Sequence, residues 1–258
     1  MKSIGIDIGS RAIKTLLLSG NSIENREVAD ATSRPSEIAG KMLAGHDGIP
    51  VVATGYGRHL LEIKDIPSVT EIKACARGVH HLCSDARVII DIGGQDLKVI
   101  ALDVNGKVAK FEMNDRCAAG TGRFLEIMAE KLNYTIADFG GAALDGKDRI
   151  TISSLCTVFA ESEVIGLLNR GEPLEDIAFA VHRSVVQKIS GMYKRLSVTP
   201  GLPVYLVGGG ALNGAIRELL ERKLETVVKV PENPQVVVAL GAAIIAGENG
   251  QSSIAVPP

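Results

Sequence analysis

The sequence lacks tryptophan, and aromatic residues make up only 3% of the chain. Proteins that bind single-stranded nucleic acid generally stack the bases on aromatic side chains above a basic groove. The formal net charge of −2 gives no sign of such a groove and no general attraction toward polyanions or anionic lipid. The composition therefore argues against nucleic-acid binding and against charge-driven binding to membranes.

Long hydrophobic runs are also absent. The longest apolar stretch, residues 236–247, is too short to span a bilayer, and no apolar core of a signal peptide follows the first residues. We therefore expect no membrane segment and a cytoplasmic location. The 258 residues, 46% hydrophobic and 22% charged, are typical of a globular protein with one large domain or two smaller ones.

Cysteine is scarce, and its spacing does not indicate disulfides. The four cysteines, Cys75, Cys83, Cys117 and Cys156, form no short Cys-x-x-Cys pair. In a reducing compartment we expect free thiols or metal ligands.

Two of these cysteines directly precede predicted helices. Cys117 comes before a predicted helix at 122–132, which Thr121 could cap, and Cys156 comes before one at 157–168. A helix N-terminus favours a thiolate, so both positions suit thiolate ligation. From the residues alone, two small buried hydrophobic side chains are an equally good interpretation. A four-thiolate centre would need these two cysteines from each of two identical chains.

What the sequence does have is an internal duplication built around glycine. Residues 4–18 align without gaps on residues 88–102. An Asp, a Gly and a Lys of each copy coincide 84 positions apart, as 91 minus 7 shows: Asp7 with Asp91, Gly9 with Gly93, and Lys14 with Lys98. Each copy reads as a hydrophobic strand, a tight glycine turn and a second strand, which predicts a β-hairpin.

Two such hairpins suit a clamp on the phosphates of a nucleotide. One Asp-x-Gly sequence alone is better interpreted as an ordinary turn at a strand end, but two in register favour phosphate binding. We expect Asp7 and Asp91 to position Mg²⁺ through water, and Gln95 to orient the attacking water. The residues predicted to bind the nucleotide are Gly9, Ser10, Lys14, Gly93 and Gly94 at the phosphates, and Gly208, Gly209 and Gly210 at the adenosine.

Other glycine motifs fail as nucleotide signatures. Residues 141–147 imitate a Walker A loop, but Asp148 stands where a Ser or Thr hydroxyl should bind Mg²⁺. Gly55-Tyr56-Gly57 and Gly120-Thr121-Gly122 lack the third glycine of a dinucleotide site. We expect neither a P-loop nor a Rossmann site.

Strands and helices alternate along most of the chain, which predicts the α/β class. Further helices are predicted at 69–82, 174–196 and 213–224, with an Ala- and Gly-rich one near 234–243 that can pack closely on another helix. Short strands are predicted at 203–207 and 226–230. We expect one subdomain of residues 1–82 with 235–258 and a second of residues 83–234, facing each other across a nucleotide cleft.

Two longer motifs resemble a known family. Residues 114–126, Asn-Asp-Arg-Cys-Ala-Ala-Gly-Thr-Gly-Arg-Phe-Leu-Glu, and residues 156–164, Cys-Thr-Val-Phe-Ala-Glu-Ser-Glu-Val, are similar to motifs of the activators of 2-hydroxyacyl-CoA dehydratases. These activators belong to a wider ATPase family that includes the ATP-hydrolysing subunits of benzoyl-CoA reductase. The resemblance covers essentially the whole chain. It implies the duplicated fold of acetate and sugar kinases, heat-shock chaperones and actin, which is RNase H-like.

The resemblance also implies a function. It implies a homodimer with one 4Fe-4S cluster, held by Cys117 and Cys156 of each chain, and Mg-ATP bound by each subunit. ATP hydrolysis to ADP would drive one electron from a ferredoxin or flavodoxin to a partner such as a 2-hydroxyacyl-CoA dehydratase or a related iron–sulfur reductase. Movement of the cleft would reach the cluster helices at Thr121 and Thr157. The chain departs from the family pattern at Cys75, where members often carry His, which bears on the partner enzyme.

Two other functions fit the same fold. One is a sugar or small-molecule kinase in which the cysteines are merely buried, although no sugar-binding insertion is evident. The other is a scaffold without redox chemistry that uses nucleotide to exchange partners.

Overall fold

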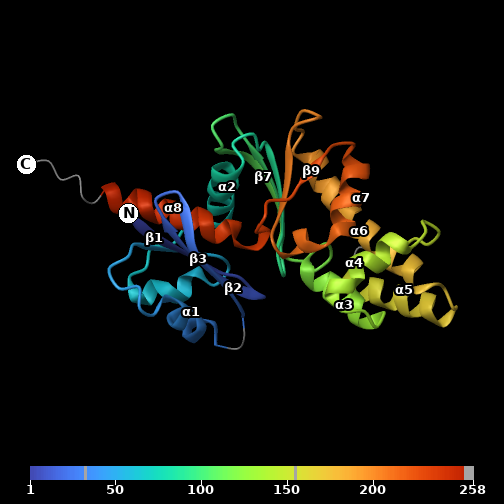
Figure 1. Ribbon diagram of the computed structural model, residues 1–258. Coiled ribbons are helices and arrows are strands. Elements are labelled where there is room, and N and C mark those ends of the chain that lie inside the picture. The colour runs from blue at the N-terminus through green and yellow to red at the C-terminus, as the bar shows by residue number, and fades with distance from the viewer. Residues whose placement is uncertain (32–33, 154–155, 253–258) are drawn as a thin grey trace, which may run out of the picture. The chain divides into compact units, whose positions relative to one another are not determined.

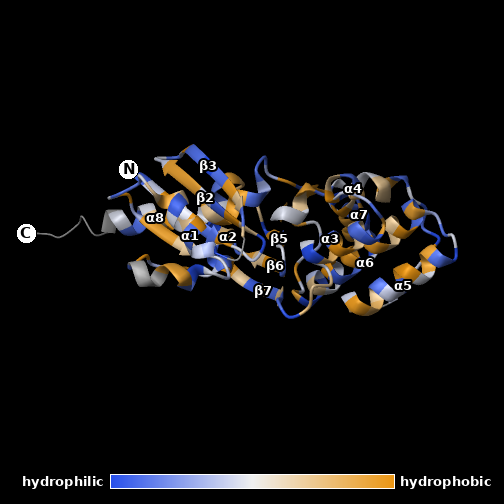
Figure 2. Cartoon of the chain, turned by 90° about the horizontal axis from the view of Figure 1, so that it is seen from below, coloured by the Kyte–Doolittle hydropathy of each residue, from blue (hydrophilic) through white to orange (hydrophobic). Residues whose placement is uncertain are grey.

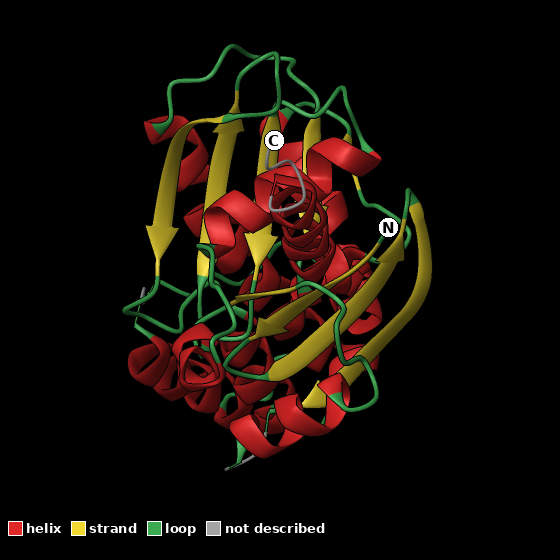
Figure 3. Cartoon of the chain, turned by 90° about the vertical axis from the view of Figure 1, so that its left-hand side faces the viewer, coloured by secondary structure: helices red, strands yellow, loops and turns green. Residues whose placement is uncertain are grey.

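The fold was analysed in a computed structural model, which describes residues 1–31, 34–153 and 156–252 (Figure 1). The chain divides into two units. Unit 1 comprises Met1–Ala86, Leu102–Ala109 and Glu232–Pro258, and unit 2 comprises Arg87–Ala101 and Lys110–Pro231. Each unit has its own sheet and its own hydrophobic core. Figure 3 shows how strands and helices are combined.

Unit 1 is built on a four-stranded sheet with the order β3-β2-β1-β4. Its strands are β1 (Lys2–Ile8), β2 (Ala12–Ser19), β3 (Ser22–Asp30) and β4 (Val51–Thr54). β1 pairs antiparallel with β2 and parallel with β4, so it is central and almost wholly buried. Helix α1 (Pro35–Leu43) and the 3₁₀ segment η1 (Arg58–Lys64) complete this part of the unit.

Helices α2 (Glu71–Leu82) and α8 (Val237–Ser252), the latter preceded by η3 (Pro234–Val236), pack on each other and α8 also packs on β1 (Figure 1). Glycines make this close approach possible. A Cβ at Gly78 would meet the carbonyl of Val237, and a Cβ at Gly241 would meet that of Ala74. Gly5 of β1 is pressed in the same way against the carbonyl of Ala239. The prediction of a closely packed helix near the C-terminal end is confirmed.

Unit 2 contains a five-stranded sheet with the order β7-β6-β5-β8-β9. The strands are β5 (Val88–Ile92), β6 (Leu97–Leu102), β7 (Val108–Asn114), β8 (Val204–Val207) and β9 (Val228–Lys229). The helices are α3 (Gly122–Lys131), α4 (Ile136–Asp145), α5 (Thr157–Asn169), α6 (Leu174–Arg195) and α7 (Gly214–Leu224), with the 3₁₀ segment η2 (Gly209–Leu212) after β8. One large cluster of buried side chains joins strands β5, β6, β8 and β9 to helices α3–α7.

The structure confirms both predicted hairpins and most predicted helices to within a few residues. The Walker-like glycines lie in and directly after helix α4, which confirms that they form no P-loop. The sequence analysis missed β3 and β7. Both strands are largely exposed. β3 is polar or charged at most positions and therefore lacks the apolar alternation that predicts a strand. β7 does alternate apolar and polar residues, but this pattern was not identified, and its apolar side chains Phe111 and Met113 are exposed.

Candidate nucleotide and thiolate sites

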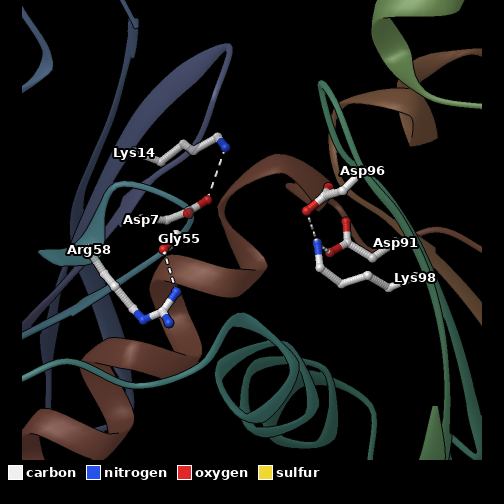
Figure 4. A network of polar contacts seen from close by, with 7 residues as sticks. All are labelled: Asp7, Lys14, Gly55, Arg58, Asp91, Asp96 and Lys98. Atoms are coloured by element: carbon white, nitrogen blue, oxygen red, sulfur yellow. Dashed lines mark hydrogen bonds and ion pairs between the residues drawn. The ribbon is translucent and has the colours of Figure 1, made fainter. Parts of the chain in front are cut away.

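The first hairpin, β1-β2, places a carboxylate opposite an amine. The strand register sets Asp7 across from Lys14, and Lys14 Nζ donates to Asp7 Oδ2 at 2.9 Å (Figure 4). The side chain of Asp7 is 4% exposed and that of Lys14 18%. Gly9 closes the turn, because its N–H donates to the carbonyl of Ala12 at 3.1 Å, and the neighbouring Ser10 is exposed.

Asp7 keeps one oxygen without a partner. Its Oδ1 is buried and accepts no hydrogen bond, and the same holds for Oγ1 of Thr54, the residue beside Asp7 in the parallel pairing of β1 with β4. A buried polar atom without a partner costs about 1–3 kcal/mol, so such atoms usually mark a place for water or an ion. Carboxylate and hydroxyl oxygens are ligands that suit Mg²⁺ or its bound water. These two residues therefore fit the predicted Mg²⁺ site.

The second hairpin, β5-β6, repeats this pair and adds a carboxylate. Lys98 Nζ lies 3.5 Å from Asp91 Oδ2 and 2.7 Å from Asp96 Oδ2 (Figure 4). The Lys98 side chain is only 1% exposed, which makes it far more buried than Lys14. Asp96 also closes the turn, since its carbonyl accepts from the N–H of Gly93 at 2.9 Å. The sequence analysis did not single out Asp96, because the aligned position of the first copy is an alanine.

The duplication extends to a glycine loop after the next parallel strand in each unit. Gly55 follows β4 with φ +94°, and Gly208 follows β8 with φ +83°. A Cβ at Gly55 would lie 2.5 Å from Asp7 Oδ1 and from the carbonyl O of Ile8, and a Cβ at Gly208 would lie at the same distances from Asp91 Oδ1 and the carbonyl O of Ile92.

The sequence analysis connected Gly208–Gly210 with the nucleotide but not the equivalent Gly55–Gly57. Both loops read Gly-x-Gly directly after a buried four-residue strand, and this shared pattern could have revealed the match.

The two glycine loops are held differently. In unit 1, Arg58 Nη1 donates to the carbonyl of Gly55 at 3.1 Å (Figure 4). In unit 2, the loop leads into Asn213, whose Oδ1 accepts from the N–H of Ile216 at the start of α7. Asn213 Nδ2 lies 2.9 Å from Nε2 of the fully buried His182.

His182 is held as a neutral ring. Its Nδ1 lies 2.8 Å from the carbonyl of Ala178, which can only accept, so Nδ1 carries the proton and Nε2 accepts from Asn213. Burial lowers the pKa of His182 to about 4, although the hydrogen bond to Ala178 opposes this. Asn213 lies 31 residues from His182 in the sequence, so no local pattern indicates this pair.

The remaining predicted residues lie in the same turns and loops. Gly94 and the exposed Gln95 form the turn of the second hairpin, and Gly209 and Gly210 lie in η2. The structure thus brings together Asp7, Gly9 and Lys14 in unit 1. In unit 2 it brings together Asp91, Gly93 and Lys98, with Gly208 against Asp91.

The two predicted ligand cysteines both belong to unit 2 and both reach the surface. Cys117 is half-buried in the loop before α3, and Cys156 is exposed at the N-cap of α5. Thiols at the surface can be shared with a second chain, so they fit a bridging metal group better than two buried hydrophobic side chains. Among the residues that the structure describes, no cluster of three or more His, Cys, Asp or Glu forms a complete metal site.

One expectation about these helices is wrong. Thr121 occupies the N-cap of α3, but its side chain does not cap the helix. Its Oγ1 donates instead to the carbonyl of Ala118 at 2.6 Å. Both residues lie in the loop of residues 117–121 before α3, which we call the cysteine loop. The helix amides find other partners, in the second hairpin turn.

Comparison with known proteins places these features in a family. The family described as the BadF/BadG/BcrA/BcrD ATPase family matches residues 4–246. The chain belongs to this ATPase family. Because residues 4–246 include both hairpins and both surface cysteines, the ATPase assignment applies to the parts of the chain that carry the candidate sites.

Individual relatives are similar in sequence to this chain over nearly their full length. A 2-hydroxyisocaproyl-CoA dehydratase activator of Clostridioides difficile is 41% identical, with 98% of this chain and 97% of the relative covered. An (R)-2-hydroxyglutaryl-CoA dehydratase activating ATPase of Acidaminococcus fermentans is 38% identical, with 95% and 96% covered. A solved structure of the activator of the 2-hydroxyisocaproyl-CoA dehydratase from Clostridium difficile with bound ADPNP has a TM-score of 0.89 at 40% identity, with 100% of this chain and 99% of that one covered.

These likenesses confirm the predicted fold class and the resemblance to dehydratase activators. More distant solved structures, under 20% identical, share the fold and show that alone. Within the described residues no helix is long and apolar enough to cross a membrane.

Proposed function

We propose that this ATPase is an electron donor that activates a partner enzyme such as a 2-hydroxyacyl-CoA dehydratase. The observation that carries the proposal is the repeated hairpin, in which a buried Asp stands opposite a Lys beside a glycine turn in each unit. The activators similar to this chain, and the ADPNP bound to one of them, support it. The division into subdomains 1–82 with 235–258 and 83–234, and the cytoplasmic location, stay predictions.

Binding of Mg-ATP is assigned to the hairpins and the glycine loops. Gly9, Ser10, Gly93 and Gly94 line the phosphates. The N–H groups of Ser10 and Gly94 are assigned to phosphate oxygens, because those of Gly9 and Gly93 already close the two turns. Lys14 adds a positive charge, and Gly208–Gly210 seat the adenosine. Asp7 and Asp91 hold Mg²⁺ through water. Gln95 orients a water that attacks the terminal phosphate, so that a new P–O bond forms to this water as the bond to ADP breaks.

Cys117 and Cys156 of each of two chains hold one 4Fe-4S cluster in a homodimer. Positive helix ends at α3 and α5 favour thiolates and an anionic group at these positions. When bound, the cluster supplies a one-electron carrier that accepts an electron from a reduced ferredoxin or flavodoxin and gives it to the partner enzyme. Val158 and Phe159 follow Cys156 on α5 and are 67% and 65% exposed, so they offer apolar side chains beside this position. Hydrophobic residues of α5 are coloured orange in Figure 2.

The deciding experiment is anaerobic purification with iron counted per dimer and the ATP-dependent reduction of an acceptor measured. We expect a coloured protein with about four irons per dimer. Cys117→Ser and Cys156→Ser should each lose iron, whereas the control Cys83→Ser should retain it. Iron-free wild-type protein would contradict the cluster.

The nucleotide site is tested separately. Asp7→Asn should abolish ATP-driven electron delivery while the iron content stays unchanged, because the first hairpin lies in unit 1 and the two ligand cysteines lie in unit 2. Asp47→Asn, a change at an exposed carboxylate, is the matched control and should retain full delivery. Loss of iron in Asp7→Asn would show that the two sites are not separable.

A sugar or small-molecule kinase is the alternative function. It predicts colourless protein and transfer of phosphate to a supplied sugar. The exposure of Cys156 and the half-buried position of Cys117 argue against it, because that alternative needs cysteines that serve only as buried packing.

A further inference from the structure

Helix α3 begins on the phosphate-binding turn of the second hairpin. The first amides of an α-helix have no partner within the helix. In α3 the N–H of Gly122 donates to the carbonyl of Gly93 at 2.9 Å, and the N–H of Arg123 donates to the carbonyl of Gly94 at 2.8 Å. The turn that we assign to phosphate binding therefore accepts hydrogen bonds from the first N–H groups of α3, the helix that follows Cys117.

Gly122 allows this contact. A Cβ at this position would lie 3.1 Å from the carbonyl oxygen of Gly93 and 3.6 Å from Cα of Gly94, so the two backbones touch. Gly120, with φ +88°, brings the same loop against the side chains of Leu97 on β6 and Lys188 on α6. The loop thus rests on the turn and on one strand of the hairpin.

Hydrogen bonds within the cysteine loop hold the residues from Cys117 to the start of α3 together. Thr121 donates through both its N–H and its Oγ1 to the carbonyl of Ala118, at 3.0 and 2.6 Å. Asn114 Nδ2 donates to the carbonyls of Cys117 at 2.8 Å and Ala119 at 3.2 Å. A displacement of the turn would consequently move the backbone from Cys117 to Gly122 as one piece.

Helix α5, which follows Cys156, shows no such connection among the residues that the structure describes. Ser153, four residues before the start of α5, donates through N–H and Oγ to Glu163 of this helix, each at 2.8 Å. Thr157 Oγ1 is buried without a partner. Within the described residues, no backbone hydrogen bond ties the first turn of α5 to either hairpin turn.

We propose that the nucleotide acts on Cys117 and not on Cys156, through the hydrogen bonds from Gly122 and Arg123 to the second hairpin turn. The inference rests on the proposed phosphate role of Gly93 and Gly94. A terminal phosphate that draws on the amides of this turn also shifts its carbonyls, because each peptide group is a rigid plane. Gly122 is then a positioning residue that couples the nucleotide to one of the two thiols.

The test compares the two thiols in the cluster-free full chain. Cys83→Ser/Cys156→Ser leaves Cys117 as the accessible thiol and Cys83→Ser/Cys117→Ser leaves Cys156, while Cys75 is buried in both. The alkylation rate with iodoacetamide is measured with Mg-ADP, with a non-hydrolysable Mg-ATP analogue and without nucleotide. We expect the analogue to change the Cys117 rate about fivefold and the Cys156 rate less than about 1.5-fold, relative to no nucleotide.

Gly122→Ala inserts a methyl group between the turn and the loop. It should bind the analogue with nearly unchanged affinity but reduce the response of Cys117 to less than about 1.5-fold. Gly141→Ala is the matched control, because a Cβ there meets nothing within 4 Å, and it should keep the full response. In the anaerobically purified chain, hydrogen exchange at the amides of Gly122 and Arg123 should change on binding the analogue.

An analogue that binds but alters both thiols equally, or leaves Cys117 unchanged, overturns the inference whatever Gly122→Ala does. These outcomes are distinct from failure of the proposed function. Iron-free protein in which only Cys117 responds to the analogue would support the coupling and refute the electron donor. A parent chain that binds no nucleotide would overturn both.

Discussion

The two hairpins share one backbone plan but differ in how they balance charge. In both, the register sets an Asp opposite a Lys seven residues later. In unit 1 Asp7 contacts a partly exposed Lys14 and keeps one oxygen without a partner. In unit 2 the buried Lys98 contacts two carboxylates, Asp91 and Asp96.

This difference suggests a division of labour. A buried ammonium between two carboxylates is firmly held, because each charge has an oppositely charged neighbour. The second hairpin is thus the more rigid one, and it is also the hairpin on which helix α3 begins. The free oxygen of Asp7 makes the first hairpin the better place for a cation or a water molecule.

The test with the largest expected effect replaces the lysine of each hairpin by methionine. Lys98→Met should cost about 3–5 kcal/mol in the free energy of unfolding, because it leaves two largely buried carboxylates without their cation. Lys14→Met should cost about 1–2 kcal/mol, since Lys14 is partly exposed to solvent and Lys98 is not. Urea unfolding measures both, with the exposed Lys110→Met as a control expected within about 0.5 kcal/mol of wild type. Equal costs would refute the difference between the hairpins.

The next test asks whether the glycine loops are equivalent. Gly55→Ala and Gly208→Ala should each cost about 2–4 kcal/mol, because the left-handed backbone disfavours a side chain and the Cβ would meet a carbonyl oxygen. Thermal and urea unfolding of the two variants should give similar values. A mild effect at Gly55 alone would show that the match between the loops is only apparent.

The last test concerns how the second loop is anchored, and its effect appears only at acidic pH. The pKa of His182 is about 4 in the folded chain and 6.5 as the ordinary value, so below pH 6.5 the unfolded chain binds a proton that the folded chain does not. Stability should therefore fall as the pH drops from 6.5 to 4, by about 1.4 kcal/mol per unit from this group. The stability that the neutral His182 contributes should be fully present above pH 6.5.

The control for this pH dependence is His182→Gln. Glutamine does not titrate, and its carbonyl can still accept from Asn213. Urea unfolding between pH 4 and 7 should show a shallower slope for the variant than for the wild type. Identical slopes would mean that folding does not lower the pKa of His182.

Much of the fold could be predicted because the central strands have a strong local pattern. The apolar runs around Asp7 and Asp91 end in glycine turns, which define a hairpin from neighbouring residues alone. The missed strands β3 and β7 are mostly exposed, so their pairing depends on the strand beside them. Asp96 was missed because its role appears only when the turn brings it to Lys98.

The sequence by itself determined the duplicated hairpins and the two cysteines at helix starts, because these depend on residues close together in the chain. The tertiary structure decided the rest. The contact of Gly122 with Gly93, the position of Gly55 against Asp7 and of Gly208 against Asp91, and the neutral state of His182 all arise from residues about 30 to about 120 positions apart. Folding alone brings such residues together, and burial then sets their charge and their hydrogen bonds.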